Sequence, residues 1–82
     1  MHEFGIASSI LAAVRAEALL HRPAKPVRVG IRIGPLAALQ RDSLEFSFES
    51  LVKDSDLDPL SLDIQEGKAD EIEFSFLELE ES

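Results

Sequence analysis

The chain has 82 residues, of which 45% are apolar, and its 8 Lys and Arg against 16 Asp and Glu give a net charge of −8 at pH 7. This length predicts one small domain, and the apolar content is too high for a disordered chain. The absence of cysteine excludes disulfides, thiolate zinc sites, iron–sulfur clusters and cysteine nucleophiles, and no apolar run approaches the roughly 20 residues that span a bilayer.

The first predicted element is a helix from about Phe4 to His21. Apolar residues recur about every four positions along it, which is typical of a helix with one buried face. Pro23 and Pro26 end it, because proline cannot continue the helical hydrogen-bond ladder. The apolar stripe consists of Ile6, Ile10, Leu11, Val14 and Ala18.

The segment from Val27 to Ile33 gives the clearest strand signal. Four β-branched residues alternate with arginine or glycine, which predicts a strand with one buried and one polar face. Gly34-Pro35 ends it. A second helix is predicted from about Asp42 to Lys53, with Asp42 or Ser43 as its cap. Its apolar face consists of Leu44, Phe48, Leu51 and Val52.

Alternating residues predict a further strand over residues 60–65 and a last strand over about 71–80, joined by a short turn that starts at Glu66. These two strands are expected to pair as an antiparallel hairpin.

The last strand changes phase along its length. Ile72, Phe74 and Phe76 share one face, whereas Leu77 and Leu79 share the other. A β-bulge close to Phe76 would restore a single buried face. Without it, the two leucines would be exposed or would contact a partner.

Together these elements predict an α+β fold, with two helices packed on one face of a small mixed β-sheet. The residues expected to be buried are Ile10, Val14, Val29, Ile31, Ile33, Phe48 and Leu51.

Charge is divided unevenly between the two halves of the chain. Residues 1–41 carry six Lys and Arg against two Asp and Glu, whereas residues 42–82 carry two against fourteen. The acidic half argues against nucleic acid and anionic membranes as partners, because both would be repelled. Without a secretory signal, a cytoplasmic location is expected.

Met1, His2 and Glu3 form the candidate metal site. A histidine in second position offers the α-amine of Met1, its own backbone amide nitrogen after deprotonation, and its imidazole. These three nitrogens lie naturally in one plane, which suits Ni(II) and Cu(II) better than zinc or magnesium. Glu3 would add an oxygen ligand or orient the imidazole. Methionine is expected to stay in the mature chain, since its removal needs a small second residue.

The alternative is that His2 binds no metal, because a second-position histidine is usually a solvated terminal residue. His21 is better explained as a partner of the helix dipole than as a metal ligand. No serine is accompanied by a histidine–carboxylate pair in a known motif, so no enzyme is predicted.

The opening MHEFGIASSIL resembles that of the HypA/HybF family, accessory proteins that carry nickel to [NiFe]-hydrogenase and, in some organisms, to urease. VRVGIRIGPLAAL is similar to the central strand and Ile-Gly turn of that family, DSLEFSFESL to its second helix, and EIEFSFLELEE to its closing strand. The resemblance implies a nickel-binding metallochaperone with Met1, His2 and Glu3 at the metal.

The chain departs from the family pattern in two ways. Family members carry a zinc module with two Cys-x-x-Cys pairs before the closing strand, where this chain has only a short turn over residues 66–70. No zinc is therefore expected, whether the shortening is natural or engineered. An acidic residue that lies close to the metal in the family is replaced by Gln40, and Pro35 takes a position that is commonly charged.

The resemblance implies a hydrogenase large subunit or a maturation GTPase as partner and leaves a homodimer open. The alternative function is a non-metal interaction module that docks through a sheet edge. The client enzyme, the oligomeric state and the choice between nickel and copper are not determined by the sequence.

Overall fold

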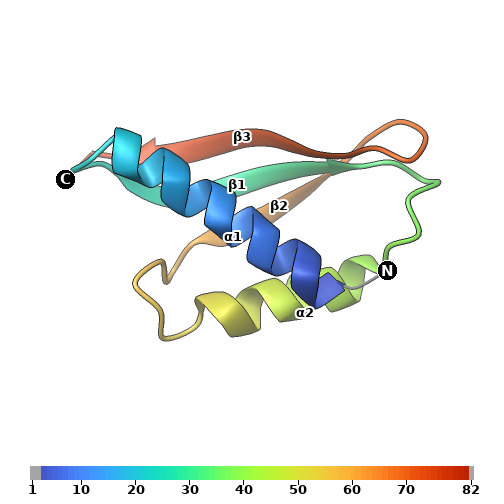
Figure 1. Cartoon of the computed structure of the whole chain (residues 1–82), viewed down its shortest axis with the longest axis horizontal. Helices are drawn as coiled ribbons and strands as arrows, with labels where there is room; N and C mark the ends of the chain where they lie inside the picture. The colour runs from blue at the N-terminus through green and yellow to red at the C-terminus, as the bar shows by residue number, and fades with distance from the viewer. Residues whose placement is uncertain (1–2, 82) are drawn as a thin grey trace.

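The computed structural model describes residues 3–81 and confirms the α+β fold class. Two helices cover one face of a three-stranded mixed sheet (Figure 1). The other face carries the arginines of the central strand and remains open. The elements in chain order are α1 (Glu3–Leu20), β1 (Lys25–Ile33), α2 (Arg41–Val52), β2 (Ser61–Glu66) and β3 (Ile72–Glu80).

The strand order is β2-β1-β3, so the predicted antiparallel hairpin between the last two strands is wrong. Val29 of β1 lies opposite Leu62 of β2 in a parallel pair and opposite Leu77 of β3 in an antiparallel pair. β1 has the most apolar face, and the centre of the sheet is where that face is best covered. Helix α2 supplies the long crossover that a parallel pair requires.

The predicted bulge in β3 is confirmed. Gly30 pairs with Phe76 and Ile31 with Phe74, which leaves Ser75 as the extra residue. Phe74 and Leu77 therefore both pack against the core. Phe76 points to the open face, where its ring occupies the space that a side chain at position 30 would need, and the Arg28 guanidinium carbon lies 5.3 Å from its centroid.

The core lies between the helices and β1, as expected, with one correction. Six of the seven residues predicted to be buried are at most 6% exposed. Leu51 is only partly buried and packs against the edge of the core. The stripe of α2 that faces inward is instead Leu44, Phe48 and Val52, which are spaced by four residues, and Leu51 flanks it.

Helix α2 begins one residue earlier than predicted. Gln40 occupies the N-cap position without a side-chain cap, so neither Asp42 nor Ser43 caps the helix as expected. Both lie inside the first turn. Asp42 still lies where negative charge favours the helix dipole.

The turn between β2 and β3 closes over the end of β1. The backbone N–H of Gly34 donates to the Glu71 carbonyl at 2.8 Å, and that of Gly67 donates to the Ile33 carbonyl at 2.9 Å. A Cβ atom on Gly34 would collide with the backbone oxygens of Lys68 and Ala69. Glycine is therefore required at the Ile-Gly strand end that the sequence singled out.

Glu71 stabilises this turn and is expected to make its stability depend on pH. Its Oε1 accepts a hydrogen bond from the Lys68 backbone N–H at 3.0 Å, which lowers the pKa of the carboxyl, and Arg32 lowers it further. A carboxyl group whose pKa is lower in the folded chain than in the unfolded chain stabilises the fold at pH values above its unfolded pKa. This stabilisation is lost as the pH falls through the folded pKa. Urea midpoints should therefore fall less between pH 6 and pH 3 for Glu71→Gln than for the parent chain.

The matched control is Asp70→Asn, which changes a neighbouring exposed carboxylate of the same turn. Its midpoints should follow those of the parent chain over this range. Equal pH slopes for Glu71→Gln and the parent would show that the Glu71 carboxylate does not stabilise the turn.

Candidate metal centre at the start of α1

Of the three residues predicted to bind metal, the structure describes one. Met1 and His2 lie outside the described residues, whereas Glu3 is the first residue of α1. The position of the Glu3 side chain therefore carries the geometry of this site.

Glu3 connects the starts of the two helices. Its Oε2 accepts a hydrogen bond from the backbone N–H of Gln40 at 2.9 Å, across 37 positions of sequence. Both helices start at the same end of the molecule, where the first turn of α1 lies next to the first turn of α2 (Figure 1). The first backbone N–H groups of a helix carry partial positive charge. This arrangement favours an anionic carboxylate at the junction and orients it.

Gln40, which stands where the family often has an acidic residue, lies beside Glu3. It contributes its backbone N–H to Glu3, and its side chain makes no cap. The loop before it is held by the Leu36 N–H, which donates to the Ala69 carbonyl at 2.8 Å. The close approach at Gly34 and this bond place the loop so that Gln40 meets Glu3. Sequence reasoning missed the bond itself because it joins residues far apart in the chain.

Among residues 3–81, no group of three or more His, Cys, Asp or Glu is arranged to hold a metal ion. His21 follows the opposite end of α1, and its Nε2 lies 3.7 Å from the Glu17 carboxylate one turn earlier. An 18-residue helix is about 27 Å long at the usual rise. His21 is therefore too distant to complete a site at Glu3. In the part of the chain that is described, no helix is long and apolar enough to cross a membrane.

Residues 1–72 match the family described as "Hydrogenase/urease nickel incorporation, metallochaperone, hypA". A hydrogenase maturation factor HypA of Desulfatibacillum aliphaticivorans is 43% identical over 68 residues, which cover 80% of this chain and 52% of that protein. The HypA of Azotobacter chroococcum mcd 1 is 36% identical over 66 residues, or 80% of this chain and 58% of that protein. The chain thus spans little more than half the length of these relatives.

The fold is similar to the solution structure of the Ni metallochaperone HypA from Helicobacter pylori. The TM-score is 0.74 at 24% sequence identity, and the match covers 93% of this chain and 72% of the other. At this identity the likeness concerns the fold. It agrees with two helices against a three-stranded mixed sheet.

Proposed function

This chain belongs to the HypA family, and we propose that it is a nickel metallochaperone that binds one Ni(II) ion and delivers it during [NiFe]-hydrogenase maturation. The observation that carries the proposal is the family match, which includes Met1, His2 and Glu3 and extends to residue 72. The hydrogen bond between Glu3 and Gln40 supports it, because it orients the carboxylate that follows the histidine.

We propose that nickel binds through the Met1 amine, the His2 amide nitrogen and the His2 imidazole. Two fused chelate rings close around the ion in this arrangement, and the three nitrogens define the plane that Ni(II) prefers. Glu3 supplies an oxygen ligand or orients the imidazole. Its bond to Gln40 keeps the carboxylate at the helix junction in either role.

Delivery requires that the ion can leave. In this proposal a second protein approaches the chelate, and its own ligands replace the weakest donor first. The recipient in this proposal is a hydrogenase large subunit or a maturation GTPase.

Titration of the metal-free protein with NiCl2, followed by calorimetry and by the weak d–d absorption of planar nickel, tests the proposal. One nickel per chain is expected, and a silent titration would favour a non-metal adaptor.

We propose further that residues 1–82 act as a single nickel-binding domain without the zinc insertion. The turn over residues 66–70 is held by hydrogen bonds, including Gly67 N–H to Ile33 and Glu71 N–H to Lys68 at 2.9 Å each. No cysteine is available as a zinc ligand. These bonds give the turn a means of support that needs no metal.

Removal of metal is therefore expected to leave the fold unchanged. The melting temperature, followed by far-ultraviolet circular dichroism, should be the same after extensive dialysis against EDTA as before it, because structural zinc contributes to folding only where ligands hold it. A decrease of more than about 4 °C, which corresponds to roughly 1 kcal/mol for a domain of this size, would contradict the absence of a structural metal.

A further inference from the structure

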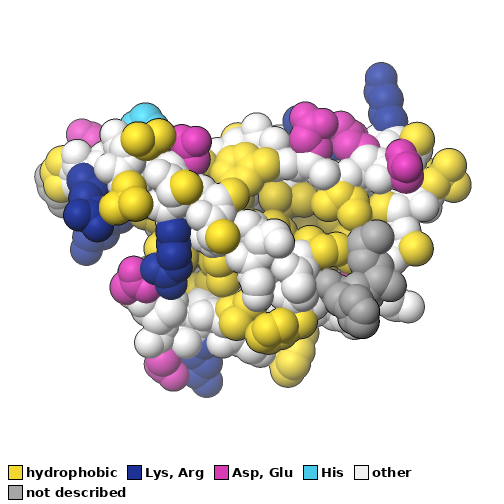
Figure 2. Space-filling model, in the orientation of Figure 1, with side chains coloured by type: hydrophobic (Ala, Val, Ile, Leu, Met, Phe, Trp, Pro, Cys, Tyr) yellow, Lys and Arg dark blue, Asp and Glu magenta, His cyan; other side chains and the backbone are white. Residues whose placement is uncertain are grey.

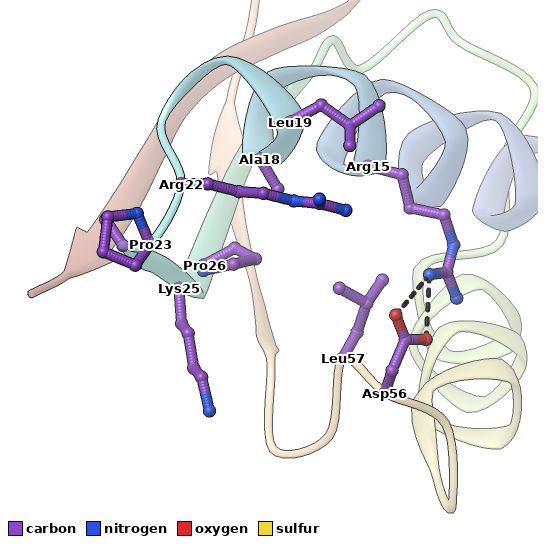
Figure 3. Close-up of a pocket in the computed structure, with 10 residues that line it drawn as sticks. Arg15, Ala18, Leu19, Arg22, Pro23, Lys25, Pro26, Asp56 and Leu57 are labelled. Carbon is purple, nitrogen blue, oxygen red and sulfur yellow. Dashed lines mark hydrogen bonds and ion pairs between the residues drawn. The ribbon is translucent and has the colours of Figure 1, made fainter. Parts of the chain in front are cut away.

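A groove lies at the opposite end of α1 from Glu3. It has a volume of about 480 Å³ and is enclosed by the end of α1, the segment leading into β1 and the loop after α2. Arg15 donates from Nη1 to both carboxylate oxygens of Asp56 at 2.8 Å, and this pair fixes the loop against the helix (Figure 3). Three segments of the chain therefore each form one wall of the groove.

Two cations of the groove have no carboxylate partner within the described chain. Arg15, Arg28, Arg32 and Arg41 each form an ion pair. Arg22 and Lys25 form none with any group in residues 3–81, although Lys25 is opposite Glu80 in the sheet register. The Arg22 side chain extends across the groove toward Arg15 (Figure 3). Two uncompensated positive charges in a chain of net charge −8 favour an anionic occupant.

The groove also has an apolar surface. Leu57 and Ala24 form part of its lining and are each 8% exposed, whereas Leu19 is 60% exposed at its rim. Basic and apolar side chains are visible together at this end of the space-filling view (Figure 2). An occupant that covered Leu19 would remove apolar surface from water, which an inorganic anion is too small to do.

We propose that this groove binds an acidic segment of a partner protein, whose carboxylates contact Arg22 and Lys25 and whose apolar side chains pack against Leu19. Nucleic acid fits less well, because its sugar–phosphate backbone has no aliphatic side chain to cover Leu19, which is exposed at the rim. An acidic, partly apolar peptide satisfies both the charges and the apolar rim.

A partner bound in the groove would leave the proposed N-terminal metal site accessible to a second protein. Arg15 is the groove residue nearest to Glu3 along α1, and twelve residues at the usual rise separate the two by about 18 Å along the helix axis. A partner held at the groove can therefore remain bound while a second protein approaches Met1, His2 and Glu3. This inference does not depend on nickel binding.

The test uses a fluorescein-labelled eight-residue peptide of alternating Glu and Leu and measures fluorescence anisotropy at low salt. Arg22→Glu should weaken binding by about tenfold, because it replaces an attractive charge with a repulsive one. Leu19→Ala should weaken it by about threefold through lost apolar contact. Lys53→Glu, which changes an exposed lysine after α2 with no ion pair among the described residues, is the matched control and should change affinity less than twofold.

Three results would overturn the proposal. Equal weakening by Lys53→Glu and Arg22→Glu would show attraction to overall charge rather than to the groove. Equal binding of a peptide with Gln in place of Glu would exclude carboxylate recognition. Sedimentation that reveals a dimer dissociated by Arg22→Glu would assign the groove to a second copy of this chain. Urea midpoints of all variants, expected to match the parent, establish that they are folded.

Discussion

His2→Ala is expected to abolish stoichiometric nickel binding while the unfolding midpoint stays the same. The variant loses the imidazole. Without this third nitrogen, the two fused chelate rings and the planar set of nitrogens cannot form around the ion. Stability should not change, because the buried core of the described residues begins at Ala7 and extends to Leu60. Calorimetry with NiCl2 and urea unfolding measure the two effects. Stoichiometric binding by His2→Ala would refute this ligand set.

An N-terminal extension by one residue is the sharper form of this test. It changes no side chain, yet it converts the Met1 amine into an amide and moves the histidine out of second position. A site that used only the imidazole and carboxylates would keep its affinity, whereas the proposed terminal chelate would lose it. If an extended protein bound nickel as tightly as the parent, the terminal mechanism would be wrong.

The same chelate predicts a steep dependence on pH. An α-amine has an ordinary pKa of about 8, and the amide nitrogen gives up its proton only when the metal binds. Each proton released on binding lowers the affinity by about tenfold for each pH unit of acidification. Apparent affinity should therefore fall by about 100-fold between pH 7 and pH 6. A loss of less than about threefold would indicate carboxylate ligands instead of the amine and amide.

The helices and the central strand could be predicted from the sequence because their signals are local. The β-branched alternation from Val27 to Ile33 and the four-residue spacing of Ile6, Ile10 and Val14 directly encode which face is buried. The bulge in β3 could be predicted too, because only an extra residue brings Phe74 and Leu77 to one face.

The strand order could not be predicted from the same information. Apolar and polar residues alternate in both β2 and β3, and the short turn between these strands is typical of a hairpin connection. The two strands compete for the edges of β1, and this competition depends on how the whole molecule covers Val29, Ile31 and Ile33. The periodicity of a single segment does not indicate which strand it pairs with.

The residues of the candidate site could be proposed from the sequence, whereas the contact that holds Glu3 in place could not. Met1, His2 and Glu3 stand together in the sequence, and Gln40 was flagged as a neighbour through the family resemblance. The bond from the Gln40 N–H to Glu3 joins two helix starts that only the tertiary structure brings together. The groove near Arg22 likewise needs Asp56 and Leu57, which are more than thirty residues away in sequence.

Phe48→Ala is expected to destabilise the chain more than an alanine substitution at any other position of α2. Phe48 is 1% exposed and belongs to the core cluster, so truncation leaves a cavity in a small core. Such changes cost about 3–5 kcal/mol, whereas a domain of this size has a total stability near the lower end of about 5–15 kcal/mol. The urea midpoint, followed by far-ultraviolet circular dichroism, should fall to a small fraction of the parent value.

The same helix provides the matched control, because Phe46 is 73% exposed and loses no core contact when it is truncated. Phe46→Ala should change stability by no more than about 0.5 kcal/mol, although it removes the same atoms. Phe48→Leu, which keeps most of the buried volume, should fall between the two and remain folded in water even if Phe48→Ala does not. Equal midpoints for Phe46→Ala and Phe48→Ala would mean that α2 does not pack on the sheet through its Leu44, Phe48 and Val52 face.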